Sequence, residues 1–241
     1  MQLHVLNSNS LGNCYILEST DSALIIECGV PFKYVQKALS FNIDKIVGAV
    51  LSHEHGDHAG RAREYARNAV KIYTHPAVAE KFKLRKIKGV EKTTFSIGDY
   101  TIRPFDIVHD VPGYGFLIKH PDMGTLCFIT DSMYINAKFP DVTHFLMEVN
   151  HVDEILEKRI AEGKLNGHLY NRVKESHMSL ETALRFLSAQ DLSSTHTIIC
   201  AHLSDTNSDA NLIRNKILSA TGKRVYVADK GANMYIGKEP F

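Results

Sequence analysis

The segment SHEHGDH, residues 52–58, places three histidines and an aspartate within six positions. A regular strand or helix would point these side chains in different directions, so only a loop brings all four into a small volume. Imidazole nitrogen and carboxylate oxygen suit a borderline ion such as zinc, with manganese or iron as alternatives. The zincin motif H-E-x-x-H is absent, because Asp57 stands where its second histidine would be. The segment therefore predicts metal ligation by His53, His55, Asp57 and His58.

Histidine is frequent elsewhere too: the 241 residues include 13 histidines and no tryptophan, with a formal net charge of +1. Asp131 follows the apolar run LCFIT and His202 follows TIICA, so each is expected where a strand ends. His109 also stands just beyond a predicted strand. Since a lone histidine is more often a packing residue than a ligand, spacing alone leaves His109 open.

Short apolar runs alternate with amphipathic segments around these residues, as is typical of α/β folds. Strands are predicted at 3–6, 14–17, 23–27, 46–52, 71–74, 100–106, 115–119, 125–130, 143–149, 195–202, 223–228 and 234–237. Helices are predicted at 31–39, 59–69, 153–163, 179–187 and 213–220. The two strand-rich halves have no linker between them, so we predict one domain, residues 1–241, of two packed sheets with helices outside.

The composition excludes several classes of protein. There are 28 Lys and Arg against 27 Asp and Glu, with 44% hydrophobic and 23% charged residues, which excludes disorder, collagen and a disulfide-stapled miniprotein. No signal peptide and no stretch of about 20 apolar residues is present, so we expect a cytoplasmic protein without a membrane partner. The four cysteines lie in apolar runs without CxxC spacing and are expected to stay reduced. The residues assign no oligomeric state.

The chain resembles the metallo-β-lactamase superfamily, whose hallmark H-x-H-x-D-H is matched in full by residues 53–58. Within that superfamily it is most similar to the WalJ/YycJ branch, which is related to the RNase Z and RNase J type nucleases. The segments that carry this resemblance are NSLGNCYIL, SHEHGDHAG, DIVHDVPGYGF, FITDS, FLMEVNHVDEIL, ESHMSLETALRFL and IICAHLSDTNS. The resemblance implies a four-layer αββα sandwich of two mixed β-sheets flanked by helices.

The resemblance also implies two divalent metal ions that share one carboxylate. The first ion would be held by His53, His55 and His109, the second by Asp57, His58 and His202, and both by Asp131. A hydroxide bridging the ions would attack the substrate, with Asp57 helping to orient it. His177, expected at the N-terminus of the 179–187 helix, would act as general acid or stabilise the phosphate.

Other histidines are predicted not to bind metal. His151 matches the branch pattern and is expected to shape the site without ligating. The rest are expected to be structural: His4, His75, His120, His144, His168 and His196. One departure from the family is Glu27-Cys28-Gly29, where relatives usually have an Asp-Ala-Gly-like turn whose Asp supports the site. This difference bears on the tuning of the site and leaves the ligand set intact.

Residues 61–92 contain ten Lys and Arg against three Glu, a local charge of +7 that suits either a phosphate-backbone contact or a solvated face.

Three functions stay open. The favoured one is a metal-dependent phosphodiesterase acting on nucleic acid, by resemblance a DNA exonuclease. The second is a small-molecule hydrolase of cyclic nucleotides, thioesters or lactams, although a bridging Asp131 replaces the cysteine of many lactamases. The third is a non-catalytic metal-binding module.

Overall fold

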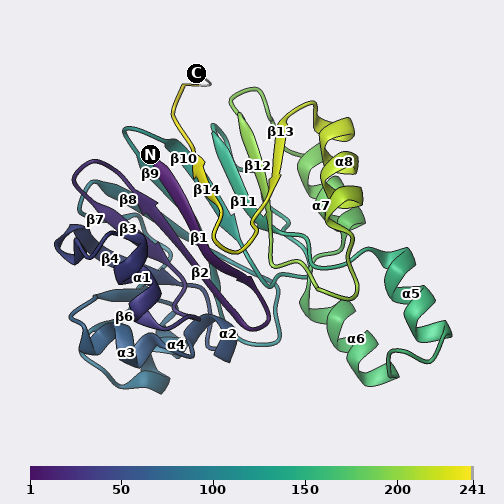
Figure 1. Ribbon diagram of the computed structural model, residues 1–241, viewed down its shortest axis with the longest axis horizontal. Helices are drawn as coiled ribbons and strands as arrows, with labels where there is room; N and C mark the ends of the chain where they lie inside the picture. Colours follow the sequence, from purple (N-terminus) through teal and green to yellow (C-terminus); the bar gives the residue numbers. More distant parts are fainter. Residues whose placement is uncertain (240–241) are drawn as a thin grey trace.

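Two seven-stranded β-sheets lie face to face, with helices on their outer surfaces, in the computed structural model of residues 1–239 (Figure 1). This arrangement confirms the predicted αββα fold. The predicted domain ends at residue 241, and its last two residues lie outside the described part of the chain.

The first sheet has the strand order β14-β1-β2-β3-β4-β5-β6. Its strands are β1 (Gln2–Asn9), β2 (Gly12–Glu18), β3 (Ala23–Ile26), β4 (Ile46–Leu51), β5 (Ile72–Thr74), β6 (Ile87–Gly89) and β14 (Asn233–Tyr235). Strands β14, β1, β2 and β3 pair antiparallel, and β3 to β6 pair parallel. The sheet is therefore mixed, as predicted.

The second sheet has the order β13-β12-β11-β10-β9-β8-β7. Its strands are β7 (Phe95–Ile97), β8 (Tyr100–Asp106), β9 (Tyr114–His120), β10 (Gly124–Ile129), β11 (His144–Glu148), β12 (Thr197–Ala201) and β13 (Arg224–Val227). Strands β10 to β13 run parallel, and β7 to β10 run antiparallel. The carboxyl ends of β10, β11 and β12 therefore meet at one edge, which is where α/β sheets generally bind ligands.

Helices cover both outer faces. They are α1 (Phe32–Ala38), η1 (Ile43–Lys45), α2 (Gly56–Ala59), α3 (Ala62–Arg67), α4 (Pro76–Phe82), α5 (Asp153–Ala161), α6 (Gly167–Ser176), α7 (Leu180–Ser188) and α8 (Ala210–Thr221). Figure 1 shows α1 to α4 on one side of the sandwich, α7 and α8 on the other, and α5 with α6 standing apart. None of the helices within residues 1–239 has the length and apolar character needed to cross a bilayer.

Three apolar layers hold this arrangement together. The central layer, between the sheets, includes the fully buried Tyr15, Phe116 and Phe128. The other two layers join each sheet to its own helices. Strands such as β3, β11 and β12 are buried along their whole length, because each faces the other sheet on one side and helices on the other. Burying apolar surface stabilises the fold by roughly 25 cal/mol per Å². All four cysteines are buried with free thiols.

The structure departs from the predicted elements in two ways. The helix predicted at 59–69 begins only at Ala62, as α3, and a separate short helix, α2, precedes it at Gly56–Ala59. Between them the Arg61 N–H donates to the Cys28 carbonyl at 2.9 Å. Elements η1, α4, α6, β6 and β7 were not predicted, since η1 and the two strands have three residues each and α6 is largely polar. Short or polar elements lack the periodic apolar pattern from which elements are recognised.

Candidate metal centre

The seven side chains predicted as ligands lie together at the edge where the strands end. The segment 52–58 follows β4, and the other ligands come from the segments after β8, β10 and β12. His55 is the N-cap of the short helix α2, and Asp57 and His58 lie within it, so the prediction of a loop for all four ligands is wrong for its second half. Two groups of possible ligand atoms form there, each with all atoms within 4.8 Å of one another. The first consists of His53, His55, His109 and Asp131, and the second of Asp57, His58, Asp131 and His202.

The first group gathers imidazole nitrogens around one carboxylate oxygen. Oδ2 of Asp131 lies 3.6 Å from Nε2 of His53 and 3.8 Å from Nε2 of His109. Nδ1 of His55 lies 3.1 Å from the same His109 nitrogen. These three nitrogens and one oxygen converge on a common point, as a tetrahedral ion requires.

The second group lies on the other side of Asp131. Nε2 of His58 is 3.4 Å from Oδ2 of Asp131 and 3.2 Å from Oδ2 of Asp57. Nε2 of His202 lies 3.3 Å from the same Asp57 oxygen. The Asp131 side chain, with only 3% exposed, therefore faces both groups at once.

Hydrogen bonds at the far ring nitrogens turn the histidines toward the centre. Nδ1 of His109 donates to the Ser176 carbonyl at 3.1 Å, and Nδ1 of His202 donates to Oε1 of Glu148 at 2.9 Å. A neutral imidazole that donates through Nδ1 keeps its lone pair on Nε2. The Nε2 atoms of His53 and His202 are buried without a hydrogen-bond partner. Such buried, unpartnered acceptors aimed at one point fit a pair of metal ions.

Glu27 replaces the family's usual Asp and supports the ligand loop directly. It is fully buried, accepts the Ser52 N–H at 3.0 Å, and accepts Nδ1–H of His58 at 3.2 Å. Its left-handed backbone, with φ of 69°, turns the longer side chain toward the loop. A Cβ on the nearby Gly29 would overlap the Asp57 carbonyl, so the turn needs glycine at that position. The substitution therefore preserves the contact to the ligand loop.

Glu148 is a site residue that the sequence reasoning missed. It is the last residue of β11, is fully buried, and accepts Nδ1–H bonds from His177 at 2.6 Å and His202 at 2.9 Å. A glutamate directly after the apolar run FLM and before Val149 was the available clue, because an ionised carboxylate is seldom buried without partners. Glu148, His177, His202 and Asp131 form a third group of possible ligands. A neutral His202 has one lone pair, so it can serve either this group or the second group, not both.

His177 lies in the pocket and follows a helix that was not predicted. It is the C-cap of α6 and stands two residues before Ser179, the N-cap of α7. Its ring centroid is 5.4 Å from that of His202, and its Nδ1 is 4.0 Å from Oδ1 of Asp131. Its Nδ1 is held by Glu148, so the Glu148 contact leaves Nε2 unengaged beside the two groups.

The charges of the cluster depend on each other. Burial opposes ionisation of Asp131, but His202 and His58 outweigh it and hold its pKa well below the usual range. Burial likewise opposes protonation of His202, whereas the Asp131 carboxylate raises its pKa. Burial and the neighbouring His58 together lower the pKa of His53. The Asp131 carboxylate and the His202 imidazole therefore each stabilise the charged form of the other.

His151 lies outside all three groups. It is buried, forms a backbone bridge with Ser179, and its Nε2 is 3.5 Å from Oδ1 of Asp153. The bridge connects the segment after β11 to the start of α7. His151 thus belongs to the segment that joins the Glu148 strand to the start of α7 and is in none of the ligand groups found among residues 1–239.

A pocket of about 350 Å³ opens onto the cluster. The residues that line it are Ser10, His55, Asp57, His109, Asp131, Asn150, Leu169, Arg172, Val173, Ser176, His177, His202, Leu203, Ser204, Thr206 and Asn207. Larger hollows exist elsewhere, including one of about 780 Å³ beside β13 and β14. The chemistry of the lining, rather than size, makes the smaller pocket the candidate functional site.

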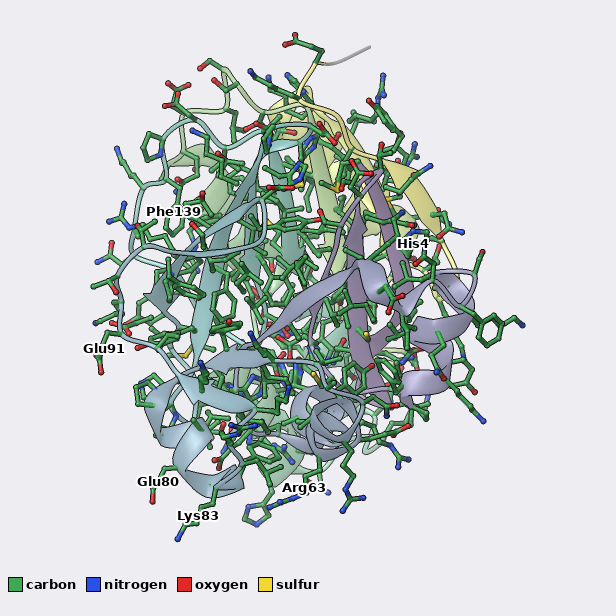
Figure 2. All side chains as sticks on the ribbon, turned by 90° about the vertical axis from the view of Figure 1, so that its left-hand side faces the viewer. His4, Arg63, Glu80, Lys83, Glu91 and Phe139 are labelled. Atoms are coloured by element: carbon green, nitrogen blue, oxygen red, sulfur yellow. The ribbon has the colours of Figure 1, made fainter. Side chains whose placement is uncertain are left out.

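The basic segment 61–92 lies next to the ligand loop. Nine of its ten cations are exposed, and Figure 2 shows Arg63 and Lys83 pointing outward at the same end of the molecule. Lys81 on α4 forms an ion pair with Glu54, which stands between the first two histidines of the loop. The guanidinium of Arg63 lies 5.4 Å from the centre of the Phe82 ring. A positively charged face thus begins beside the metal cluster.

Comparison with known proteins agrees with this geometry. Residues 9–126 match the model of the family described as Metallo-beta-lactamase superfamily. The chain is 26% identical to exodeoxyribonuclease YycJ of Bacillus anthracis, over 90% of this chain and 88% of the relative. It is 24% identical to exodeoxyribonuclease WalJ of Streptococcus pneumoniae serotype 2, over 84% and 81% of the two chains.

Among solved structures, the chain is similar to the metallo-β-lactamase fold protein YhfI from Bacillus subtilis. The TM-score is 0.74 with 19% identity, and the match covers 97% of this chain and 98% of the other. At this identity the likeness concerns the fold.

Proposed function

Because the chain carries a metallo-β-lactamase superfamily domain, we propose that it is a metal-dependent phosphodiesterase that shortens DNA from an end. The observation that carries the proposal is the pair of ligand groups sharing Asp131. Two exodeoxyribonucleases among the relatives support DNA as the substrate and an exonucleolytic reaction. The exposed cations of residues 61–92 offer a face for a phosphate backbone.

Seven side chains would hold two divalent ions, for which zinc suits the nitrogen and oxygen ligands and manganese or iron are alternatives. When bound, such ions lower the pKa of water and neutralise charge on phosphate oxygens. The residues that would hold them are His53, His55 and His109 for one, Asp57, His58 and His202 for the other, and Asp131 for both.

The remaining groups would orient the reacting atoms. Asp57, whose Oδ2 lies between the His58 and His202 rings, would also orient the attacking water. The water would release one proton to solvent as its oxygen forms a bond to phosphorus and the bond to the leaving oxygen breaks, and Nε2–H of His177 would protonate that leaving oxygen. Glu148 holds His177 at Nδ1, so the opposite nitrogen faces the pocket.

A substrate panel tests this proposal. Purified protein would be incubated with end-labelled single- and double-stranded DNA, RNA, cyclic nucleotides, a thioester and a lactam. We expect metal-dependent shortening of DNA that a chelator abolishes and that Asp131→Ala reduces by more than about 10³-fold, since both metal sites lose a ligand. Asp44→Ala, which removes an exposed carboxylate in η1, should leave the rate unchanged. Hydrolysis of cyclic nucleotides, a thioester or a lactam with DNA left intact would contradict the proposal.

A further inference from the structure

Helices α5 and α6 form a hairpin that stands apart from the sandwich (Figure 1). They share a small apolar cluster of their own, built around Leu156, Leu165 and Val173. Lys174 on α6 lies 3.3 Å from Asp153 on α5, so ion pairing adds to the apolar contact. The hairpin lies outside residues 9–126, which match the superfamily model.

The second helix of the hairpin is connected to the metal cluster at its carboxyl end. The carbonyl of Ser176 accepts Nδ1–H of His109, and His177 follows immediately with its own contact to Glu148. Its amino end is capped by the Asn166 side chain, which accepts the Leu169 N–H at 2.8 Å. Helix α6 is therefore a short rod of fixed position relative to the candidate ligands.

Four residues of α6 line the metal pocket, of which Val173 and Ser176 are buried and two are exposed. The exposed two are Leu169 and Arg172, which are three residues apart and therefore neighbours on the helix surface. Leu169 is 44% exposed despite its apolar side chain. Within residues 1–239, Arg172 is the sole Lys or Arg that lines this pocket. It is exposed and has no carboxylate within ion-pair distance in that part of the chain.

We propose that α6 binds the substrate strand next to the reacting phosphate. The Arg172 guanidinium would bind a neighbouring phosphate, and Leu169 would pack against a sugar or base. Arg172 and His177 both line the pocket that opens onto the ligand groups, so one bound strand can contact the two side chains. The inference rests on the proposed function, which it deepens by assigning a residue that distinguishes a polynucleotide from a small phosphodiester.

The chemistry of both side chains suits this role. Arginine presents a rigid fork of donors that matches two oxygens of one phosphate. A contact remote from the reacting bond supplies binding energy that can be used to position the substrate. A substrate without a second phosphate cannot make the proposed contact to Arg172. Arg172 should therefore matter for oligonucleotides and not for small diesters.

Steady-state kinetics on two substrates test the proposal with the complete, metal-loaded protein. For a single-stranded DNA oligonucleotide, Arg172→Ala should lower kcat/KM by about 10- to 100-fold, the range for a lost hydrogen bond to a charged group. Turnover of bis(p-nitrophenyl) phosphate should change by less than twofold, and Arg172→Lys should recover part of the loss because it keeps the charge without the fork. Lys158→Ala, which removes a cation from α5 outside the pocket, is the charge-matched control and should change neither value.

Binding supplies a readout that does not depend on catalysis. Fluorescence anisotropy would follow a labelled oligonucleotide with phosphorothioate linkages, which resist hydrolysis, at several salt concentrations. Arg172→Ala should reduce the slope of log affinity against log salt by about 0.7, as expected for one phosphate contact to a single strand. An unchanged slope, or an equal loss of turnover on both substrates, would overturn the inference.

The two proposals fail in different ways. If wild-type protein degrades DNA and Arg172→Ala does so equally well, the assignment of Arg172 is wrong and the proposed function stands. If wild-type protein binds the oligonucleotide through Arg172 but leaves DNA intact, the proposed function is wrong and the binding assignment stands. An oligonucleotide that wild-type protein does not bind contradicts the inference directly.

Discussion

The parallel strands β11 and β12 carry histidine near both of their ends, yet the two ends differ in chemistry. At the amino ends, the rings of His144 and His196 lie 5.8 Å apart. At the carboxyl ends, His202 donates to Glu148 and lies 2.8 Å from Asp131. Histidine is present at both ends, and the two ends differ in whether the fold places carboxylates next to it.

The pKa values of His144 and His202 shift in opposite directions because their neighbours differ. His144 is buried and donates Nε2–H to the Gly237 carbonyl, and burial lowers its pKa to about 4. His202 is equally buried, but the carboxylate of Asp131 raises its pKa. A buried histidine with only a carbonyl and another ring beside it stays neutral and structural. One surrounded by carboxylates is placed to ligate or to carry charge.

The largest effect that separates the two ends is expected from His177→Ala. This variant removes the proposed proton donor at the carboxyl ends and should lower the rate of DNA hydrolysis by about 10²- to 10³-fold, as for a lost general acid. Metal content, measured by elemental analysis, should stay at the wild-type value. His196→Ala at the amino ends is the matched control and should retain the rate. Loss of metal from His177→Ala would show that His177 is a ligand, as the third group would allow.

A smaller effect is expected from Glu148→Gln, which keeps the shape of the side chain. A glutamine oxygen is a weaker acceptor, and its NH₂ group would oppose the ring N–H of His177 or His202. Loss of such an orienting partner costs about 10- to 100-fold in metal affinity or activity. Competition with a chromophoric chelator measures the metal affinity. If the affinity and the rate both remain at wild-type levels, Glu148 does not orient the rings.

The smallest effect should appear at the amino ends, as a pH dependence of stability. His144 has a folded-state pKa of about 4 against roughly 6.5 in the unfolded chain, so the unfolded state binds more protons between these values. The neutral His144 therefore contributes fully to the free energy of unfolding above pH 6.5. This contribution is lost as the pH falls toward 4, and about 2 kcal/mol of it is lost at pH 5. Urea unfolding of wild-type protein and His144→Gln at pH 7.5 and pH 5 measures it.

The variant should lose less free energy of unfolding between the two pH values than wild-type protein does, because glutamine does not titrate. Its activity at pH 7.5 should be unchanged, since His144 is remote from the ligand groups. Identical pH dependence in the two proteins would mean that His144 is not held neutral by burial.

The local patterns of apolar and polar residues in this chain were enough to predict much of the architecture. The apolar runs LCFIT and TIICA predicted β10 and β12, because a strand with both faces covered must be apolar along its length. The resemblance supplied the mixed αββα sandwich, which is confirmed. Helix α6 was not predicted, because its sequence GHLYNRVKES is mostly polar and only Val173 and Ser176 are buried. Its position depends on packing against α5 rather than on a periodic apolar face.

The residues of the ligand loop are recognisable by type and spacing, since three imidazoles and a carboxylate in six positions are costly to place together without a partner. By itself, therefore, the sequence determined the kind of chemistry. The tertiary structure decided which nitrogen of each ring faces the centre, that Glu148 orients His177 and His202, and that Arg172 enters the pocket. These outcomes depend on contacts between segments far apart in the chain, and no local pattern of residues encodes the distance between two strand ends.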